Sequence, residues 1–264
     1  MLGVYRALFA AEVAAAAQYR IQSVLWLLFA VVRPVVFLAA WTAAASTQGG
    51  SIGDFSTADF AAYYVCLSLV IQITNAWDAY DFEFEVRTGR LAPKLLRPLH
   101  PLHYAAMSSI VHKLFTVPML LPVLVVLAWR FNAHFSTQPW HVVLFVPSVL
   151  LAAVLRFTFG WVLASLAFWT TRITSIMEFY DRLLFLFAGT IAPLSLLPGP
   201  LATLGYALPF GYMIWAPTEI LRGGTTLVQT FQLIGIQLVW LLVSWVAFRI
   251  IWHRGVRQFS AVGA

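Results

Sequence analysis

Long apolar blocks separated by short polar connections run through the whole chain. Of its 264 residues, 61% are hydrophobic and only 10% are charged, and the mean hydropathy is +0.85. Soluble domains usually carry about 25% charged and 45–50% apolar residues. A transmembrane helix needs about 20 apolar residues, so a chain of this length accommodates about six spans. The sequence therefore predicts an all-α integral membrane protein, with one transmembrane domain over residues 1–264 and no separate soluble domain.

The apolar blocks predict six transmembrane helices. The fourth block is longer than the ~30 Å hydrocarbon core requires, so it must tilt, bend or project from the bilayer. A turn-rich connection at 46–57 and a short polar link at 172–182 separate neighbouring blocks. The predicted spans are residues 21–45, 58–76, 104–128, 140–171, 183–197 and 226–251.

Residues 1–20 form an apolar segment with interspersed charge. Arg6, Glu12 and Arg20 make it a poor membrane span. Its larger apolar side chains recur on one side of a helix. We therefore expect an amphipathic helix that lies at the cytoplasmic interface.

The positions of the basic residues predict the topology. If both termini are cytoplasmic, most of the 16 Lys and Arg residues face the cytoplasm, and the external loops hold only Arg130 and Arg222. This is the positive-inside pattern of a multi-pass protein of the cell (inner) membrane. Arg33 and Arg156 fall inside predicted spans, where a charge is expensive and indicates function, snorkelling or an ion pair.

Residues 189–224 are apolar but interrupted by proline and glycine throughout. No continuous helix of membrane-spanning length can form there. Broken backbone at membrane depth is tolerated only where protein or water satisfies it. We expect a pair of short re-entrant helices that dip in from the outside, just before the last span.

The charged stretch at residues 77–103 places acidic residues before basic ones. Asp81 and Glu85 precede Arg87, an order that suits the dipole of a helix over residues 77–88. A helix of this kind, exposed on the cytoplasmic side, indicates a segment that binds another protein.

Two residues mark where this helix and the next one would end. Gly89 supplies a left-handed end, and a second short helix over 90–96 would stop before Pro98. The apolar face of the first helix would consist of Trp77, Tyr80 and Phe84.

Several classes of function are excluded by missing motifs. The sequence holds no G-x-x-x-x-G-K-[ST], so the chain does not bind ATP through a P-loop, and no G-x-S-x-G or H-E-x-x-H is present. The histidines are scattered, and the single Cys66 allows neither a disulfide nor a cysteine-based metal site. Basic residues spread between apolar blocks do not suit nucleic-acid binding. We expect no catalytic, cofactor or metal site in this chain.

One enzymatic alternative stays open. Asp78, Asp81 and Glu85 would share a helical face, and Glu178 and Asp181 repeat the spacing. Two such acidic faces could hold Mg²⁺ and a diphosphate, as in membrane prenyl or lipid phosphotransferases. The phosphotransferase pattern D-x-x-D-G-x-x-A-R is broken, however, at the positions that Phe82, Glu85 and Val86 occupy. An ion-coupled secondary carrier is a further alternative, although no predicted span carries a carboxylate near its middle.

Four sequence segments are distinctive: RTGRLAPKLLRP at 87–98, PFGY at 209–212, PTEILRG at 217–223 and GVRQFSAVGA at 255–264. Together they resemble the permease subunits of type-two ABC exporters, in the branch of small six-span permeases with a separately encoded ATPase. The likeness covers nearly the whole chain.

The resemblance implies a non-catalytic permease that pairs with a second permease, as a homodimer or heterodimer, and with two ATPase subunits that bind ATP and Mg²⁺. Its cargo would be an amphipathic drug or antibiotic, a lipid or a glycan, and lipids would surround it. Residues 78–98 would match the coupling helix, within a cytoplasmic coupling region at 77–103, and the order of charges adds Asp81 and Glu85 to it. The residues carried over by motif are Arg87, Gly89, Leu91, Leu95, Leu96, Arg97 and Pro98.

Overall fold

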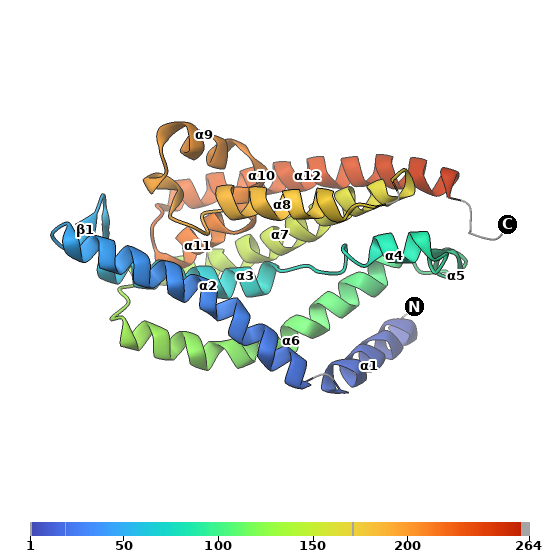
Figure 1. The fold of residues 1–264 in the computed structure, drawn as a ribbon, viewed down its shortest axis with the longest axis horizontal. Coiled ribbons are helices and arrows are strands. Elements are labelled where there is room, and N and C mark those ends of the chain that lie inside the picture. Colours follow the sequence, from blue (N-terminus) through green and yellow to red (C-terminus); the bar gives the residue numbers. More distant parts are fainter. Residues whose placement is uncertain (1, 19, 171, 260–264) are drawn as a thin grey trace.

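The computed structural model describes residues 2–18, 20–170 and 172–259, and this part of the chain is almost entirely helical (Figure 1). The long helices run roughly along one axis, with the short helices α4 and α5 at one end and α9 and α11 toward the other. The elements are α1 (Leu2–Gln18), α2 (Arg20–Thr47), β1 (Ser51–Ile52), β2 (Phe55–Ser56), α3 (Thr57–Thr74), α4 (Phe82–Arg87), α5 (Leu91–Leu95), α6 (Pro101–Arg130), α7 (Pro139–Ala164), η1 (Ser165–Phe168), α8 (Thr174–Phe187), η2 (Leu194–Leu196), α9 (Gly199–Ala207), α10 (Pro209–Met213), α11 (Trp215–Arg222) and α12 (Leu227–Gln258).

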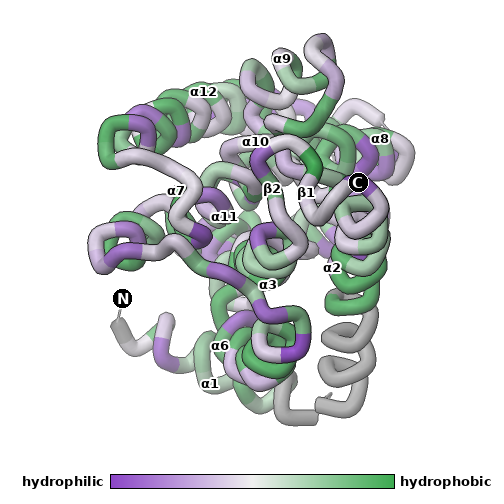
Figure 2. The backbone as a smooth tube through the Cα atoms, turned by 90° about the vertical axis from the view of Figure 1, so that its left-hand side faces the viewer, coloured by the Kyte–Doolittle hydropathy of each residue, from purple (hydrophilic) through white to green (hydrophobic). Residues whose placement is uncertain are grey.

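Four helical segments in the described part of the chain are long and apolar enough to cross a membrane: α3, α6, α7 with η1, and α12. The stretch Val31–Thr47 of α2 is a shorter apolar helix. These segments coincide with five of the six predicted spans, and Figure 2 shows mostly hydrophobic residues along the long helices. The chain is a membrane protein with several candidate spans; the count of six and the orientation of the termini stay predictions.

The expected boundary between a polar link and a fifth span was wrong. α8 begins at Thr174, inside the expected link, and ends at Phe187. Its 14 residues reach only ~21 Å at 1.5 Å per residue, less than a hydrocarbon core. Its polar residues lie on one side, while the buried residues recur every three to four positions: Met177, Tyr180, Leu184 and Phe187.

Side chains from α2 and α3 satisfy the backbone where α8 ends. Gly189 has a φ of 76°, which ends the helix. The Tyr63 hydroxyl donates to the Gly189 carbonyl at 2.6 Å. The Ile191 carbonyl accepts from the Tyr64 hydroxyl at 2.6 Å and from Trp41 Nε1 at 2.7 Å. Protein donors thus replace the missing helical hydrogen bonds, as broken backbone in an apolar setting requires.

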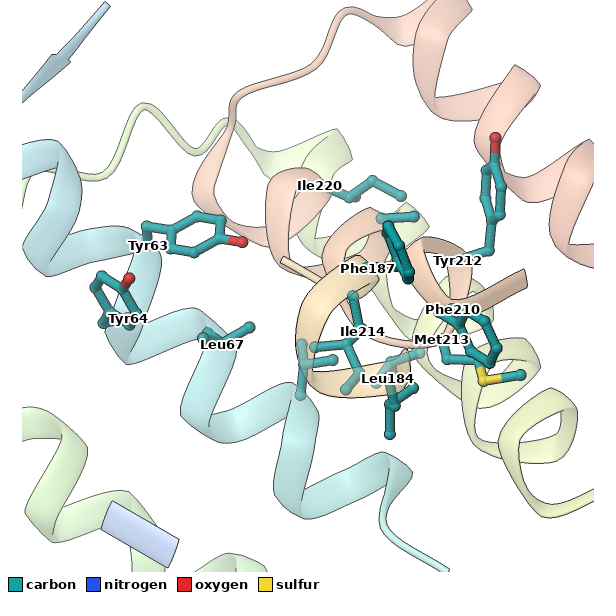
Figure 3. Close-up of a cluster of buried hydrophobic side chains, with 14 of the residues drawn as sticks. Tyr63, Tyr64, Leu67, Leu184, Phe187, Phe210, Tyr212, Met213, Ile214 and Ile220 are labelled. Carbon is teal, nitrogen blue, oxygen red and sulfur yellow. The ribbon is translucent and has the colours of Figure 1, made fainter. Parts of the chain in front are cut away.

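The proline- and glycine-rich segment forms the short helices α9, α10 and α11, one more than the expected pair. α10 and α11 pack into the main hydrophobic cluster, together with residues of α3 and α8 (Figure 3), and α9 packs against α8 and α10. Gly211 has no room for a side chain, because a Cβ there would meet the Gly205 carbonyl at 2.7 Å. The re-entrant position of these helices in a bilayer stays a prediction.

Regular elements are found where the N-terminal helix and the first loop were expected. α1 occupies the predicted helix at 1–20, and the Tyr5 hydroxyl contacts His103 Nδ1 at 3.1 Å. Its position at a membrane surface is still a prediction. The connection at 46–57 holds the antiparallel hairpin β1–β2, and Ser56 then caps α3 by accepting from the Asp59 amide at 3.2 Å.

A buried polar contact joins α12, α7 and α10. The Gln237 amide nitrogen donates to the Ser148 carbonyl at 3.2 Å and to the Tyr212 carbonyl at 2.9 Å. The Ser148 hydroxyl donates to Gln237 Oε1 at 3.0 Å. Gln237 and Ser148 are fully buried. Interhelical hydrogen bonds of this kind fix helix positions where apolar contacts alone specify little.

We predict that Gln237→Leu lowers stability. The Ser148 hydroxyl would lose its acceptor, and the carbonyls of Ser148 and Tyr212 would lose their donor. The expected loss is about 0.5–2 kcal/mol. Thermal unfolding of the detergent-purified protein measures it. The matched control is Gln232→Leu, at an exposed position of the same helix. Equal effects of the two substitutions would contradict the assignment.

Candidate functional site

The charged stretch forms two short helices, α4 and α5, which with the preceding turn make up the α4–α5 element (residues 77–98). The predicted helix over 77–88 was too long, because residues 77–81 form turns and α4 begins at Phe82. Asp78 and Asp81 therefore lie outside the helix that holds Glu85, so a shared helical face was wrong, although all three side chains line one small hollow.

The predicted apolar face was also wrong. Phe82, which the prediction passed over, is 1% exposed, whereas Trp77 and Phe84 are 54% and 44% exposed. The turn at 77–81 changes which side chains are buried, because it brings Ala79 and Phe82 against the protein.

Phe82 is held by an aromatic cluster that we call the aromatic anchor: Phe82, Trp161, Phe168 and Trp252. The Phe82 ring lies 5.0 Å from that of Trp161, 5.5 Å from Phe168 and 5.5 Å from Trp252, measured between ring centroids. These partners come from α7, η1 and α12. Aromatic pairs at such distances add to the stability gained by burial. The anchor therefore fixes α4 to the ends of two long helices.

Glu83 joins α4 to the start of α8. Its Oε2 accepts from the backbone amides of Ile173 at 2.8 Å and Thr174 at 3.2 Å, and from the Thr174 hydroxyl at 3.1 Å. Burial alone raises the pKa of Glu83, but these donors outweigh it and the net pKa lies below the usual value. A carboxylate at a helix N-terminus satisfies free amides and interacts favourably with the dipole.

Tyr80 makes a second connection to α8. Its hydroxyl donates to Asp181 Oδ2 at 2.7 Å. Burial, followed by the neighbouring Asp181 carboxylate, raises the pKa of Tyr80 well above its usual value, so the phenol keeps its proton. The α4–α5 element thus contacts α8 at both its first turn and its middle.

The two short helices are also joined to each other. Gly89 has a φ of 74° and makes the turn between them, as predicted. Lys94 forms an ion pair with Glu85. The Arg90 guanidinium lies over the Phe84 ring, 5.0 Å from its centroid. Leu91 is fully buried and Leu95 packs beside it.

The outer side of the element is exposed and basic. Leu96 is 88% exposed. Arg97 lies 5.8 Å from the Tyr104 ring centroid, and Asp81 and Pro98 are exposed as well. We define the exposed tip as Phe84, Arg87, Arg90, Leu96 and Arg97.

The two arginines predicted inside spans contact different helices. The Arg33 guanidinium of α2 lies over the Phe185 ring of α8, 5.3 Å from its centroid. Arg156 of α7 donates to the Thr74 hydroxyl of α3 at 3.2 Å.

From the element, packing continues through α8 to the short helices. Tyr180 donates to Met213 Sδ at 3.8 Å, and Leu184 and Phe187 join the cluster that holds α10 (Figure 3). A movement of α8 therefore displaces the short helices, because close-packed interiors transmit strain.

The acidic residues do not form a metal centre. Among the described residues, no group of three or more His, Cys, Asp or Glu side chains is placed to hold a metal ion. Asp181 accepts the hydrogen bond from Tyr80, and Glu178 is exposed. Burial raises the pKa of Asp78 to about 6. Asp78, Asp81 and Glu85 line one small hollow beside the start of α6, which Glu178 and Asp181 do not line. The two acidic sets that the phosphotransferase alternative combines are thus not brought together in it.

The sequence did not indicate the hydrogen bond of Tyr80, the cap that Glu83 provides or the buried position of Phe82. Their partners lie about 80 to 170 residues further along the chain, and no local spacing indicates them. The alternation of apolar and acidic residues from Phe82 to Glu85 was the one local pattern that could have drawn attention to these residues.

Comparison with known proteins identifies a family. Residues 31–263 match the family described as ABC-2 family transporter protein. No curated protein matches the chain.

We predict that Gly255→Ala weakens the aromatic anchor. A Cβ at Gly255 would overlap the Phe168 ring, so α12 or η1 must shift. Thermal unfolding should show a loss of about 1–3 kcal/mol. At Gly235 of the same helix, a Cβ meets nothing within 4 Å. Gly235→Ala should be neutral or stabilising by roughly 0.5–1 kcal/mol, and a similar loss at both sites would refute the proposed contact.

We predict that Glu83→Ala loosens the first turn of α8. Loss of a capping acceptor costs about 0.5–2 kcal/mol. Amide hydrogen exchange at residues 173–177 should accelerate accordingly, by about 2- to 30-fold. Glu178→Ala, at an exposed position of α8, is the control. Unchanged exchange in Glu83→Ala would show that the carboxylate does not cap this helix.

Proposed function

The chain belongs to the ABC-2 transporter membrane-protein family, and we propose that it is the permease subunit of an ATP-driven exporter whose energy comes from a partner ATPase. Membership in this family implies an ATPase partner and a membrane subunit that is typically non-catalytic. The observation that carries the finer proposal is the α4–α5 element, which is fixed firmly to the protein on one side and exposed on the other.

The exposed tip is the surface that the ATPase binds. Three arginines surround exposed Phe84 and Leu96, since Lys94 is already paired with Glu85. A partner groove with apolar walls and carboxylates at its rim would complement this surface. ATP and Mg²⁺ bind to the ATPase, and this chain needs no cofactor of its own.

Transport then follows a two-state movement. Nucleotide-driven closure of two ATPase subunits displaces the exposed tip. The aromatic anchor and Glu83 carry the displacement to α7, α12 and α8, because the element cannot move independently of them. The helices rock and change access to a pathway between two permease subunits.

The cargo is an amphipathic molecule of the drug, lipid or glycan type. Both termini and the α4–α5 element face the cytoplasm, in keeping with the distribution of Lys and Arg. The short helices α9, α10 and α11 lie at the opposite end of the molecule, where they close the external side of the pathway (Figure 1).

We predict that Arg87→Ala/Arg97→Ala weakens assembly with the ATPase. Removing two rim charges should lower affinity about 3- to 30-fold, with a steeper effect at low salt. Co-purification with the ATPase, followed by transport-linked ATP hydrolysis in proteoliposomes, measures this.

The control is Arg182→Ala/Arg257→Ala, which removes two exposed charges outside the exposed tip. Full assembly and full coupling in Arg87→Ala/Arg97→Ala would reject the exposed tip as the docking surface. Failure of the unmodified chain to bind any ATPase would reject the proposed function itself.

A further inference from the structure

A groove of about 1370 Å³ runs along α12 and α7 and ends at the start of α6. Pockets for small molecules usually measure about 300–1,000 Å³, so this groove has room for a larger, extended occupant. Its walls are apolar along most of their length. They include Val154, Leu238, Leu242 and Trp245, all of which are exposed.

One end of the groove is cationic. Arg249 and Arg254 line it together with His253, and all three are exposed. Within the described part of the chain, neither arginine has a carboxylate within ion-pair distance. Among the described arginines, Arg222 alone has such a partner, Glu219. The cationic end therefore has unused capacity for an anion.

The cationic end lies at the membrane surface on the side of the α4–α5 element. The His100 ring lies 4.6 Å from the Trp252 ring, and Trp252 belongs to the aromatic anchor. In Figure 1 the end of α12 and the α4–α5 element occupy the same end of the molecule. The apolar walls extend from there toward the middle of α7 and α12, which are candidate spans.

We propose that this groove binds an acidic phospholipid of the adjacent leaflet, with its acyl chains along α7 and α12 and its phosphate at Arg249 and Arg254. An apolar channel with cations at one end matches the two parts of such a lipid. Basic pockets between transmembrane helices on the cytoplasmic side bind anionic head groups, at about 1 kcal/mol per Lys or Arg near the surface.

A second copy of the chain is the less suitable occupant. Two copies related by an axis along the membrane normal would meet through the same face. Their cationic ends would then lie in the same leaflet and repel each other. A lipid instead neutralises the two arginines.

Assignment of the groove to the cytoplasmic leaflet rests on the proposed function, whereas lipid binding itself does not need the ATPase. Binding is therefore measured on the full chain alone. Native mass spectrometry of the detergent-purified protein is titrated with phosphatidylglycerol and, in parallel, with phosphatidylcholine of the same chain length.

The proposal predicts tighter binding of phosphatidylglycerol, weakened ~10- to 30-fold in Arg249→Gln/Arg254→Gln. The control Arg182→Gln/Arg257→Gln, which removes two exposed charges outside the groove, should bind as the unmodified chain does. Leu242→Trp, which fills the apolar wall, should weaken both lipids.

Two results would overturn the proposal. One is equal binding of both lipids, or equal weakening in both arginine pairs, which would indicate general surface charge. The other is efficient disulfide cross-linking of two copies of the Leu242→Cys/Cys66→Ser variant, which would make the groove a permease interface. ATPase assembly is scored separately, so loss of lipid binding leaves the proposed function intact.

Discussion

Burial of the Phe82 side chain is the interaction on which the position of the α4–α5 element depends. The ring sits among Trp161, Phe168 and Trp252, and it brings α4 against the ends of α7 and α12. Gly255 makes this possible, because any side chain there would occupy the space of Phe168. With the ring in place, Glu83 reaches the first amides of α8 and Tyr80 reaches Asp181. Without the ring, the element keeps the smaller apolar contacts of Ala79 and Leu91 and polar bonds of small individual value.

The other end of α8 is governed by a different constraint. A helix that stops inside an apolar environment leaves carbonyls without partners. Tyr63, Tyr64 and Trp41 supply the missing donors, so α8 can end early and the chain can continue into three short helices. α8 is thus capped by the α4–α5 element at one end and by α2 and α3 at the other. α8 thus links the α4–α5 element to the short helices that follow it.

What could be predicted from the sequence was local. Apolar length located α3, α6, α7 and α12, and Gly89 marked a real turn because only its own backbone matters there. The polar residues before Leu183 suggested a link, yet the stripe of Met177, Tyr180 and Leu184 was already the signal of an amphipathic helix. The anchor and the Glu83 cap escaped prediction for another reason: each depends on residues far along the chain, whose proximity is decided by helix packing.

The central claim is that the α4–α5 element and α8 move as one body. Pulsed electron paramagnetic resonance tests it on the complex with the ATPase, without nucleotide and with trapped ATP. Spin labels at Thr88 and Glu178 report the distance between the element and α8, and labels at Thr88 and Val125 report its distance from α6; all three positions are exposed. A labelled complex that retains ATPase activity serves as the control. The account predicts that nucleotide leaves the first distance unchanged and shifts the second, whereas a shift of the first with the second constant would contradict it.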